Sequence, residues 1–75
     1  MDEGYILSNK FRRAIFDGFA SGETNLIVIT KKHRIILNVA KRIVDDFIKG
    51  GILEKKGNRY ILTKEGEKLA KIIRG

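Results

Sequence analysis

Residues 50–66 read GGILEKKGNRYILTKEG, and this stretch decides the fold. It contains two short, mainly apolar runs that are separated by the pair Gly57-Asn58. Two such runs around a two-residue Gly/Asn turn predict a β-hairpin. We expect its strands over residues 52–56 and 59–62.

The register of this hairpin follows from its two-residue turn, which pairs Leu53 with Leu62 and Lys55 with Tyr60. Three basic side chains flank the turn, and the pairing places them at an exposed tip: Lys55, Lys56 and Arg59. A turn needs no positive charge to fold. These side chains therefore indicate a separate, electrostatic role.

A helix is predicted just before the hairpin, over residues 36–49. At roughly 100° per residue, Ile36, Ala40, Ile43 and Phe47 fall within about 40° of one another and form a side that packs. The flanks of this side are also apolar: Leu37, Val39 and Val44. The opposite side is polar and mostly basic: Asn38, Lys41, Arg42, Asp45 and Lys49.

Another helix is predicted over residues 9–20, with Ser8 as its N-cap. Its apolar residues recur at helical spacing and form one stripe: Phe11, Ala14, Ile15, Gly18 and Phe19. Phe16 lies off this stripe, so it either flanks the core or belongs to a partner surface. We assign it to the core.

Two shorter helices complete the prediction. The segment over residues 25–32 is rich in β-branched residues, which favour a strand, but the apolar spacing and a possible Thr24 cap favour a helix. We interpret it as a helix. The last helix is expected over residues 64–74, with Thr63 as its cap.

Positive charge is concentrated in the middle of the chain. The net charge of the 75 residues is +7, and residues 31–60 hold nine basic and three acidic side chains, a net of +6. A patch of this kind is the expected electrostatic footprint of a protein that binds a polyanion. The alternative is a basic surface that serves only solubility.

The composition argues against several other classes of protein. With 75 residues and 43% hydrophobic content, we expect one folded domain over residues 1–75. The sequence has no Cys and a single His, and it lacks Ser/His/Asp or Cys/His sets, so we expect neither a metal, a cofactor nor an enzyme. His33 is interpreted as a turn residue.

The location of the protein is inferred from the same features. The longest apolar run has only four residues, from Leu26 to Ile29, so no membrane span is expected. The first residues carry acids where a secretory signal carries bases. We therefore expect a cytoplasmic protein, and we expect it to be nucleoid-associated only in so far as the basic residues 31–60 bind DNA.

This order of elements resembles the winged helix-turn-helix family of transcriptional regulators, especially its small archaeal members. Members of the family have a glycine, a hydrophobic pair and an acid before the hairpin, and residues 50–54 (GGILE) match this pattern. They also have an aromatic residue, a hydrophobic residue, Leu and Thr after the turn, followed by a Gly in the next helix. Residues 60–63 (YILT) and Gly66 match this second pattern. The resemblance covers about residues 8–73. It implies an α+β, mostly helical fold with a three-helix core, a two-stranded wing and a C-terminal helix. Many members have Gly between the second and third helices, where this chain has His33-Arg34.

The resemblance implies a regulator that binds double-stranded DNA, with the helix over residues 36–49 in the major groove and the wing on the backbone. The residues expected to read bases are Leu37, Asn38, Lys41 and Arg42. The residues expected on the DNA backbone are Lys31, Lys32, Arg34, Lys55, Lys56, Asn58 and Arg59. Asp45 is expected to pair with Arg42 or Lys49 on the helix surface.

A homodimer is expected, joined through the helix over residues 9–20, the last helix, or both. A small core gains from extra burial, and paired half-sites multiply specificity. Two other functions stay open. One is a winged-helix protein-interaction module of a larger assembly, and the other is a nucleic-acid-binding protein with little sequence preference.

Overall fold

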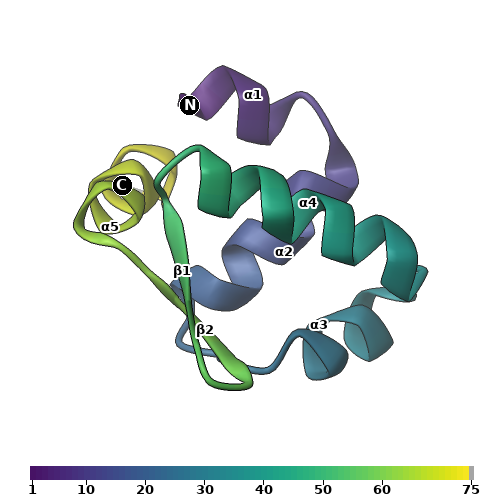
Figure 1. The fold of residues 1–75 in the computed structure, drawn as a ribbon. Helices are drawn as coiled ribbons and strands as arrows, with labels where there is room; N and C mark the ends of the chain where they lie inside the picture. Colours follow the sequence, from purple (N-terminus) through teal and green to yellow (C-terminus); the bar gives the residue numbers. More distant parts are fainter. Residues whose placement is uncertain (75) are drawn as a thin grey trace.

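The computed structural model describes residues 1–74, which form five helices and one two-stranded antiparallel sheet (Figure 1). In chain order the elements are α1 (Glu3–Leu7), α2 (Lys10–Ala20), α3 (Leu26–His33), α4 (Leu37–Lys49), β1 (Leu53–Lys56), β2 (Arg59–Leu62) and α5 (Lys64–Arg74). The predicted α+β, mostly helical class is therefore confirmed. The structure adds one short helix, α1, to the expected order.

The hairpin has the predicted register, with Leu53 opposite Leu62 and Lys55 opposite Tyr60. Gly57 in the turn has a positive φ of 62°. A glycine adopts this conformation without the steric cost that a Cβ atom would bring. The turn chemistry and the alternation of apolar residues thus fix the pairing that the sequence predicts.

Two of the three predicted helix caps are wrong by one residue. Asn9, rather than Ser8, caps α2, and its side-chain oxygen accepts hydrogen bonds from two main-chain amides at 2.8 and 3.1 Å. Asn25, rather than Thr24, caps α3 and accepts one such bond at 2.9 Å. Asparagine is among the best N-cap residues, because its side-chain oxygen reaches these otherwise unpaired amides. The third cap is as predicted: the Thr63 hydroxyl accepts a hydrogen bond from the third residue of α5.

The short helix α1 explains why Ser8 is not a cap for α2. The Asp2 carboxylate accepts a hydrogen bond from the Tyr5 amide at 3.0 Å and starts α1. Ser8 ends this helix, and its hydroxyl donates to the Tyr5 carbonyl at 3.1 Å. Ile6 is fully buried, so α1 covers one end of the hydrophobic core.

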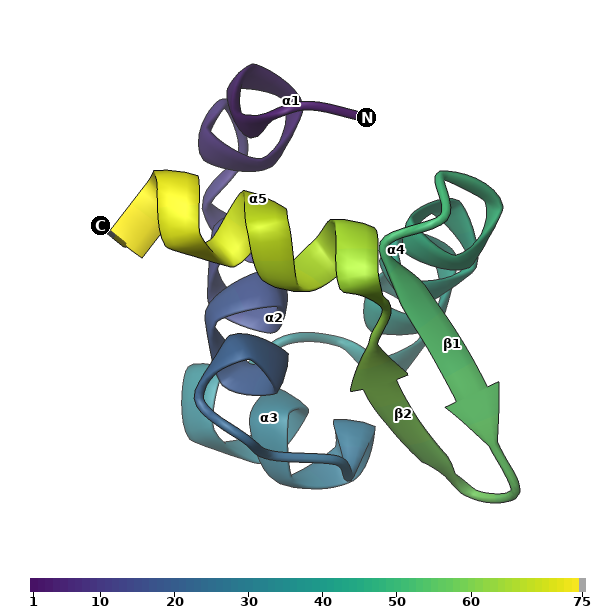
Figure 2. The same cartoon turned by 90° about the vertical axis from the view of Figure 1, so that its left-hand side faces the viewer.

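Helix α2 lies at the centre of the molecule and contacts α1, α3, α4, α5 and β2. Figure 2 shows α5 crossing α2, with α1 beyond one end and α3 at the other. Phe16 of α2 belongs to the core, as assigned, and its ring meets that of Phe47 edge to face at a centroid distance of 6.2 Å. Gly66 of α5 lies directly against the Ile52 carbonyl, so a Cβ atom has no room there.

The packed side of α4 is predicted correctly except at its first position. Ala40, Ile43 and Phe47 are buried, but Ile36 is 72% exposed. The prediction is wrong there because α4 begins at Leu37, and Ile36 is the N-cap residue with extended backbone angles. An extended residue does not follow the helical spacing. The core position is taken by Ile35, which is 6% exposed.

Candidate nucleic-acid interface

The outward side of α4 carries most of the predicted base-reading residues. Asn38, Lys41 and Arg42 are exposed, and no protein partner holds their side chains by a hydrogen bond or ion pair within residues 1–74. Leu37 is half-buried and packs against the core, so only part of its side chain is accessible. Asn38, Lys41 and Arg42 thus form an exposed polar surface on the first two turns of α4.

Two carboxylates lie on the same helix. Asp45 is exposed, and within the described chain the ion pairs are Lys56 with Glu54 and Lys68 with Glu65, so the predicted pairing of Asp45 is wrong. Asp46 accepts a hydrogen bond from the Tyr5 hydroxyl at 3.4 Å and so connects α4 to α1. The basic side of α4 therefore includes one carboxylate that no neighbouring cation neutralises. Such a group repels phosphate.

The turn between α3 and α4 presents three more exposed cations, from Lys31, Lys32 and Arg34. Lys31 and Lys32 lie in the last turn of α3, where the helix dipole favours positive charge. Arg34 ends α3 in the left-handed conformation, with φ 53° and ψ 47°, and its amide donates to the Thr30 carbonyl. The position where many members of the resembled family have Gly thus adopts the backbone conformation that glycine favours.

The tip of the hairpin is exposed, as predicted. Lys55, Lys56, Asn58 and Arg59 are all open to solvent. Lys56 lies 3.5 Å from Glu54, and the Lys55 ammonium lies 6.0 Å from the centre of the Tyr60 ring. Because the side chains of both partners are exposed, this ion pair is weak and leaves the Lys56 ammonium accessible.

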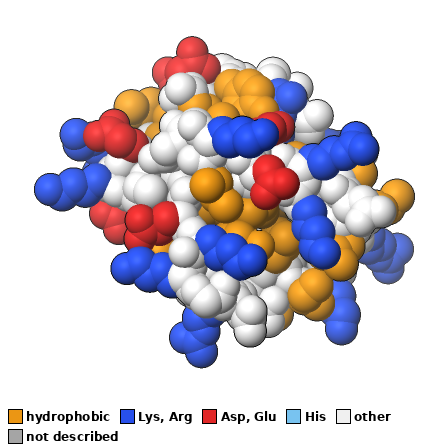
Figure 3. Space-filling view, viewed as in Figure 1, with side chains coloured by type: hydrophobic (Ala, Val, Ile, Leu, Met, Phe, Trp, Pro, Cys, Tyr) orange, Lys and Arg blue, Asp and Glu red, His pale blue; other side chains and the backbone are white. Residues whose placement is uncertain are grey.

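The outward side of α4 and the hairpin lie on one side of the molecule. β1 packs against α4, and both appear at the front in Figure 1 and at the right in Figure 2. Figure 3 looks onto this face and shows Lys and Arg side chains spread over it, with a few acidic and hydrophobic ones between them. A rod-shaped polyanion can therefore reach α4 and the hairpin together.

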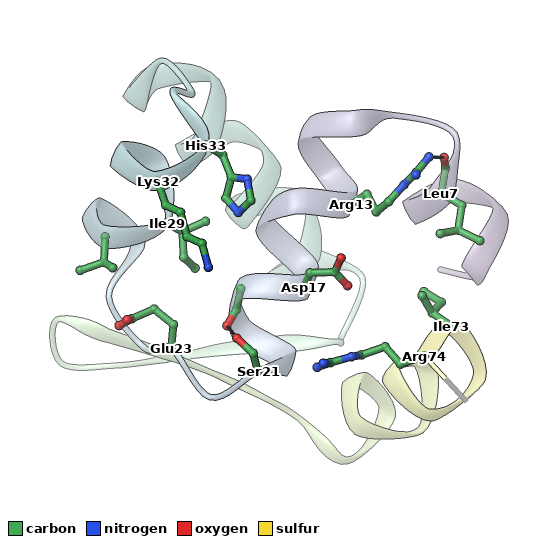
Figure 4. Close-up of a pocket in the computed structure, with 12 residues that line it drawn as sticks. Leu7, Arg13, Asp17, Ser21, Glu23, Ile29, Lys32, His33, Ile73 and Arg74 are labelled. Atoms are coloured by element: carbon green, nitrogen blue, oxygen red, sulfur yellow. Dashed lines mark hydrogen bonds between the residues drawn. The ribbon is translucent and has the colours of Figure 1, made fainter.

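An open groove of about 750 Å³ lies between α2, α3 and α5, and Lys32, one of the predicted phosphate contacts, lines it together with His33 (Figure 4). Its walls combine aliphatic side chains with polar ones of mixed charge, and sequence reasoning did not identify it. Two of its charged groups are held by the chain itself: the Arg13 guanidinium donates to the Leu7 carbonyl at 3.0 Å, and the Glu23 carboxylate accepts from the Thr24 and Asn25 amides. No group of three or more potential metal ligands occurs within residues 1–74.

No protein-family model, curated protein or solved structure matches this chain. Among residues 1–74, no helix has the length and apolar character needed to cross a membrane. Assignment of a function therefore depends on the arrangement of the chain's own side chains.

Proposed function

We propose that this protein is a winged helix-turn-helix transcriptional regulator that binds double-stranded DNA. Helix α4 enters the major groove, and the β1–β2 hairpin is the wing that lies on the backbone. The observation that carries this proposal is the common face of α4 and the hairpin, which holds exposed cations from both elements.

The chemistry of α4 suits the reading of bases. The major groove admits an α-helix, and each base pair presents there a different pattern of donors and acceptors. Asn38 can pair with the N6 and N7 atoms of adenine, while Lys41 and Arg42 can donate to O6 and N7 of guanine. Leu37 has only its exposed part available for apolar contact. Asp45 can accept from the N4 amino group of cytosine, since it has no ion-pair partner on the helix.

The remaining cations suit phosphate binding. Lys31, Lys32 and Arg34 precede α4, and Lys55, Lys56 and Arg59 surround the wing tip. Phosphate contacts of this kind position a protein on the duplex without reading its sequence. Because Lys32 lines the groove between α2, α3 and α5, five of these cations are expected to neutralise one phosphate each. The logarithm of the binding constant then falls with the logarithm of salt concentration with a slope of about −4.5. Asn58 is exposed at the tip of the wing and adds at most one polar contact.

A homodimer is part of the proposal, because two half-sites multiply specificity. Helix α2 is enclosed by other elements, and its outward residues, Lys10, Arg13 and Asp17, are charged. Helix α5 instead carries Ile72, whose exposed fraction is 62%. The neighbouring α1 carries Leu7, whose exposed fraction is 38%. The proposed dimer therefore forms through α5.

Binding of a labelled duplex, measured by fluorescence anisotropy over a series of salt concentrations, tests this function. Duplexes selected from a random pool supply the specific site. Replacing Asn38 and Arg42 by Ala is expected to relax sequence preference, because these residues contact bases. Failure to bind any duplex at low salt would contradict the proposal.

The role of the wing is tested with a charge-matched pair of variants. The first replaces Lys55, Lys56 and Arg59 by Ala and is expected to weaken binding to all duplexes alike, with a salt slope about 3 smaller in magnitude. The control replaces three exposed lysines of α5 by Ala: Lys64, Lys68 and Lys71. Equal effects of the two triple variants would mean that only net charge matters. That result favours non-specific binding over a positioned wing.

A further inference from the structure

We propose that Ile36 and Val39 read thymine through its 5-methyl group, so that the preferred DNA site has thymine opposite the beginning of α4. This inference rests on the proposed DNA-binding function and adds the chemical identity of bases that it recognises. It assigns a role to two aliphatic side chains that sequence periodicity placed on or beside the packed side of the helix.

The first observation is the exposure of these side chains. Ile36 is 72% exposed, the largest fraction among the large hydrophobic residues of the described chain, and Val39 is 37% exposed. The fold does not need an isoleucine at position 36, because the neighbouring Ile35 fills the core, and an N-cap position favours Asn, Asp, Ser or Thr over an aliphatic residue. An apolar side chain held in water at this place is available for a partner.

The second observation is the polar setting of the pair. Ile36 is the N-cap residue of α4 and Val39 lies in its first turn, so both exposed side chains belong to the beginning of this helix. Around them in sequence are the exposed polar side chains of Arg34, Asn38 and Arg42. Figure 3 shows hydrophobic side chains among Lys and Arg side chains over α3 and the beginning of α4.

This setting favours DNA over a protein as the occupant. The central part of a protein–protein interface is depleted of lysine, whereas the same stretch of chain carries exposed lysines at positions 32 and 41. Their charge is complementary to a phosphate backbone. In the major groove the one apolar group on a base edge is the thymine methyl, and aliphatic side chains contact it. The residues at the start of a recognition helix are the ones that reach base edges.

The experiment removes the methyl group and nothing else. The duplex that the wild-type protein selects from a random pool is prepared with each thymine replaced in turn by deoxyuridine, which pairs identically but lacks the 5-methyl group. Wild-type affinity is expected to fall about fourfold at one or two positions, the effect of burying one methyl group. Ile36→Ala is expected to bind the methylated and unmethylated duplexes equally at the position that it contacts.

Ile72→Ala is the matched control, since Ile72 is also a highly exposed isoleucine, at 62%, but lies on α5. This variant is expected to keep the fourfold ratio between thymine and deoxyuridine duplexes, whatever its absolute affinity. Specific binding with no thymine in the selected site, or with deoxyuridine tolerated at every position, would overturn the inference and leave DNA binding intact. Absence of binding to any duplex would overturn both.

Discussion

Replacement of Arg34 by Gly is expected to stabilise the protein and weaken DNA binding at the same time. Arg34 has φ 53° and ψ 47°, and it is the only residue other than glycine with positive φ in the described chain. Its side chain is exposed and makes no ion pair within residues 1–74. The substitution therefore removes backbone strain without removing any contact that supports the fold.

The size of the stability gain follows from two opposing terms. An L-residue in the left-handed conformation costs about 1–2 kcal/mol, which glycine avoids. Glycine loses about 0.5–1 kcal/mol more backbone entropy on folding. With the middle of each range, the net gain is about 0.75 kcal/mol, which corresponds to an increase in Tm of about 3–6 °C for a domain of this size.

Thermal and urea unfolding followed by circular dichroism measure this gain, and an unchanged urea m-value shows that the denatured state is unaffected. Arg34→Ala is the control, because it removes the same charge but keeps a Cβ atom. It is expected to show no increase in Tm. If Arg34→Gly is no more stable than Arg34→Ala, the left-handed backbone does not carry the predicted strain.

The same substitution is expected to lower the affinity for DNA, although it raises the stability of the fold. Both variants remove one proposed phosphate contact, so their affinity for DNA is expected to be lower than that of the wild type at salt concentrations below the physiological value. The slope of log affinity against log salt concentration is expected to become smaller in magnitude by about 0.9. Arg34→Lys keeps the charge and is expected to retain the wild-type slope. An unchanged slope in Arg34→Gly would remove Arg34 from the set of phosphate contacts.

Three further substitutions test the fold and the assembly. Gly66→Ala is expected to lower the free energy of unfolding by about 2 kcal/mol, because the new Cβ meets a main-chain carbonyl, whereas Gly4→Ala meets only the Asp2 side chain at 3.5 Å, an ordinary contact, and is expected to cost less in the same urea titration. Asn9→Ala is expected to cost about 1 kcal/mol through loss of the α2 cap, and a larger loss in Ser8→Ala would contradict the cap assignment. Ile72→Lys is expected to convert a homodimer, with twice the chain mass of 8.5 kDa, into a monomer in sedimentation equilibrium. A wild-type protein that sediments at the monomer mass would contradict the dimer.

The parts of the fold that could be predicted are those set by strong local periodicity. The hairpin register follows from alternation around Gly57-Asn58, because a slip by one residue would turn Leu53 and Leu62 away from the core. The buried side of α4 follows from the recurrence of Ala40, Ile43 and Phe47. In both elements, local pattern and tertiary packing favour the same structure, and the prediction is correct.

The parts that could not be predicted depend on choices between adjacent residues of similar chemistry. Ser8 and Asn9 can both cap a helix, and the outcome depends on α1, whose five residues are too few to show a periodic pattern. The pairing expected for Asp45 fails for a related reason. An exposed ion pair gains little over hydration, so spacing on a helix does not ensure that the side chains meet.

The error at Ile36 has a direct consequence for the proposed site. A helical projection assumes that the helix continues through every residue plotted, and one residue of extended backbone at the start changes the direction of a side chain. Here the change moves an isoleucine from the expected core to the solvent beside Asn38. Residues at the beginning of a recognition helix are the ones that contact base edges. The first residue of the helix is therefore where sequence periodicity is least reliable and where proposed base reading depends most on coordinates.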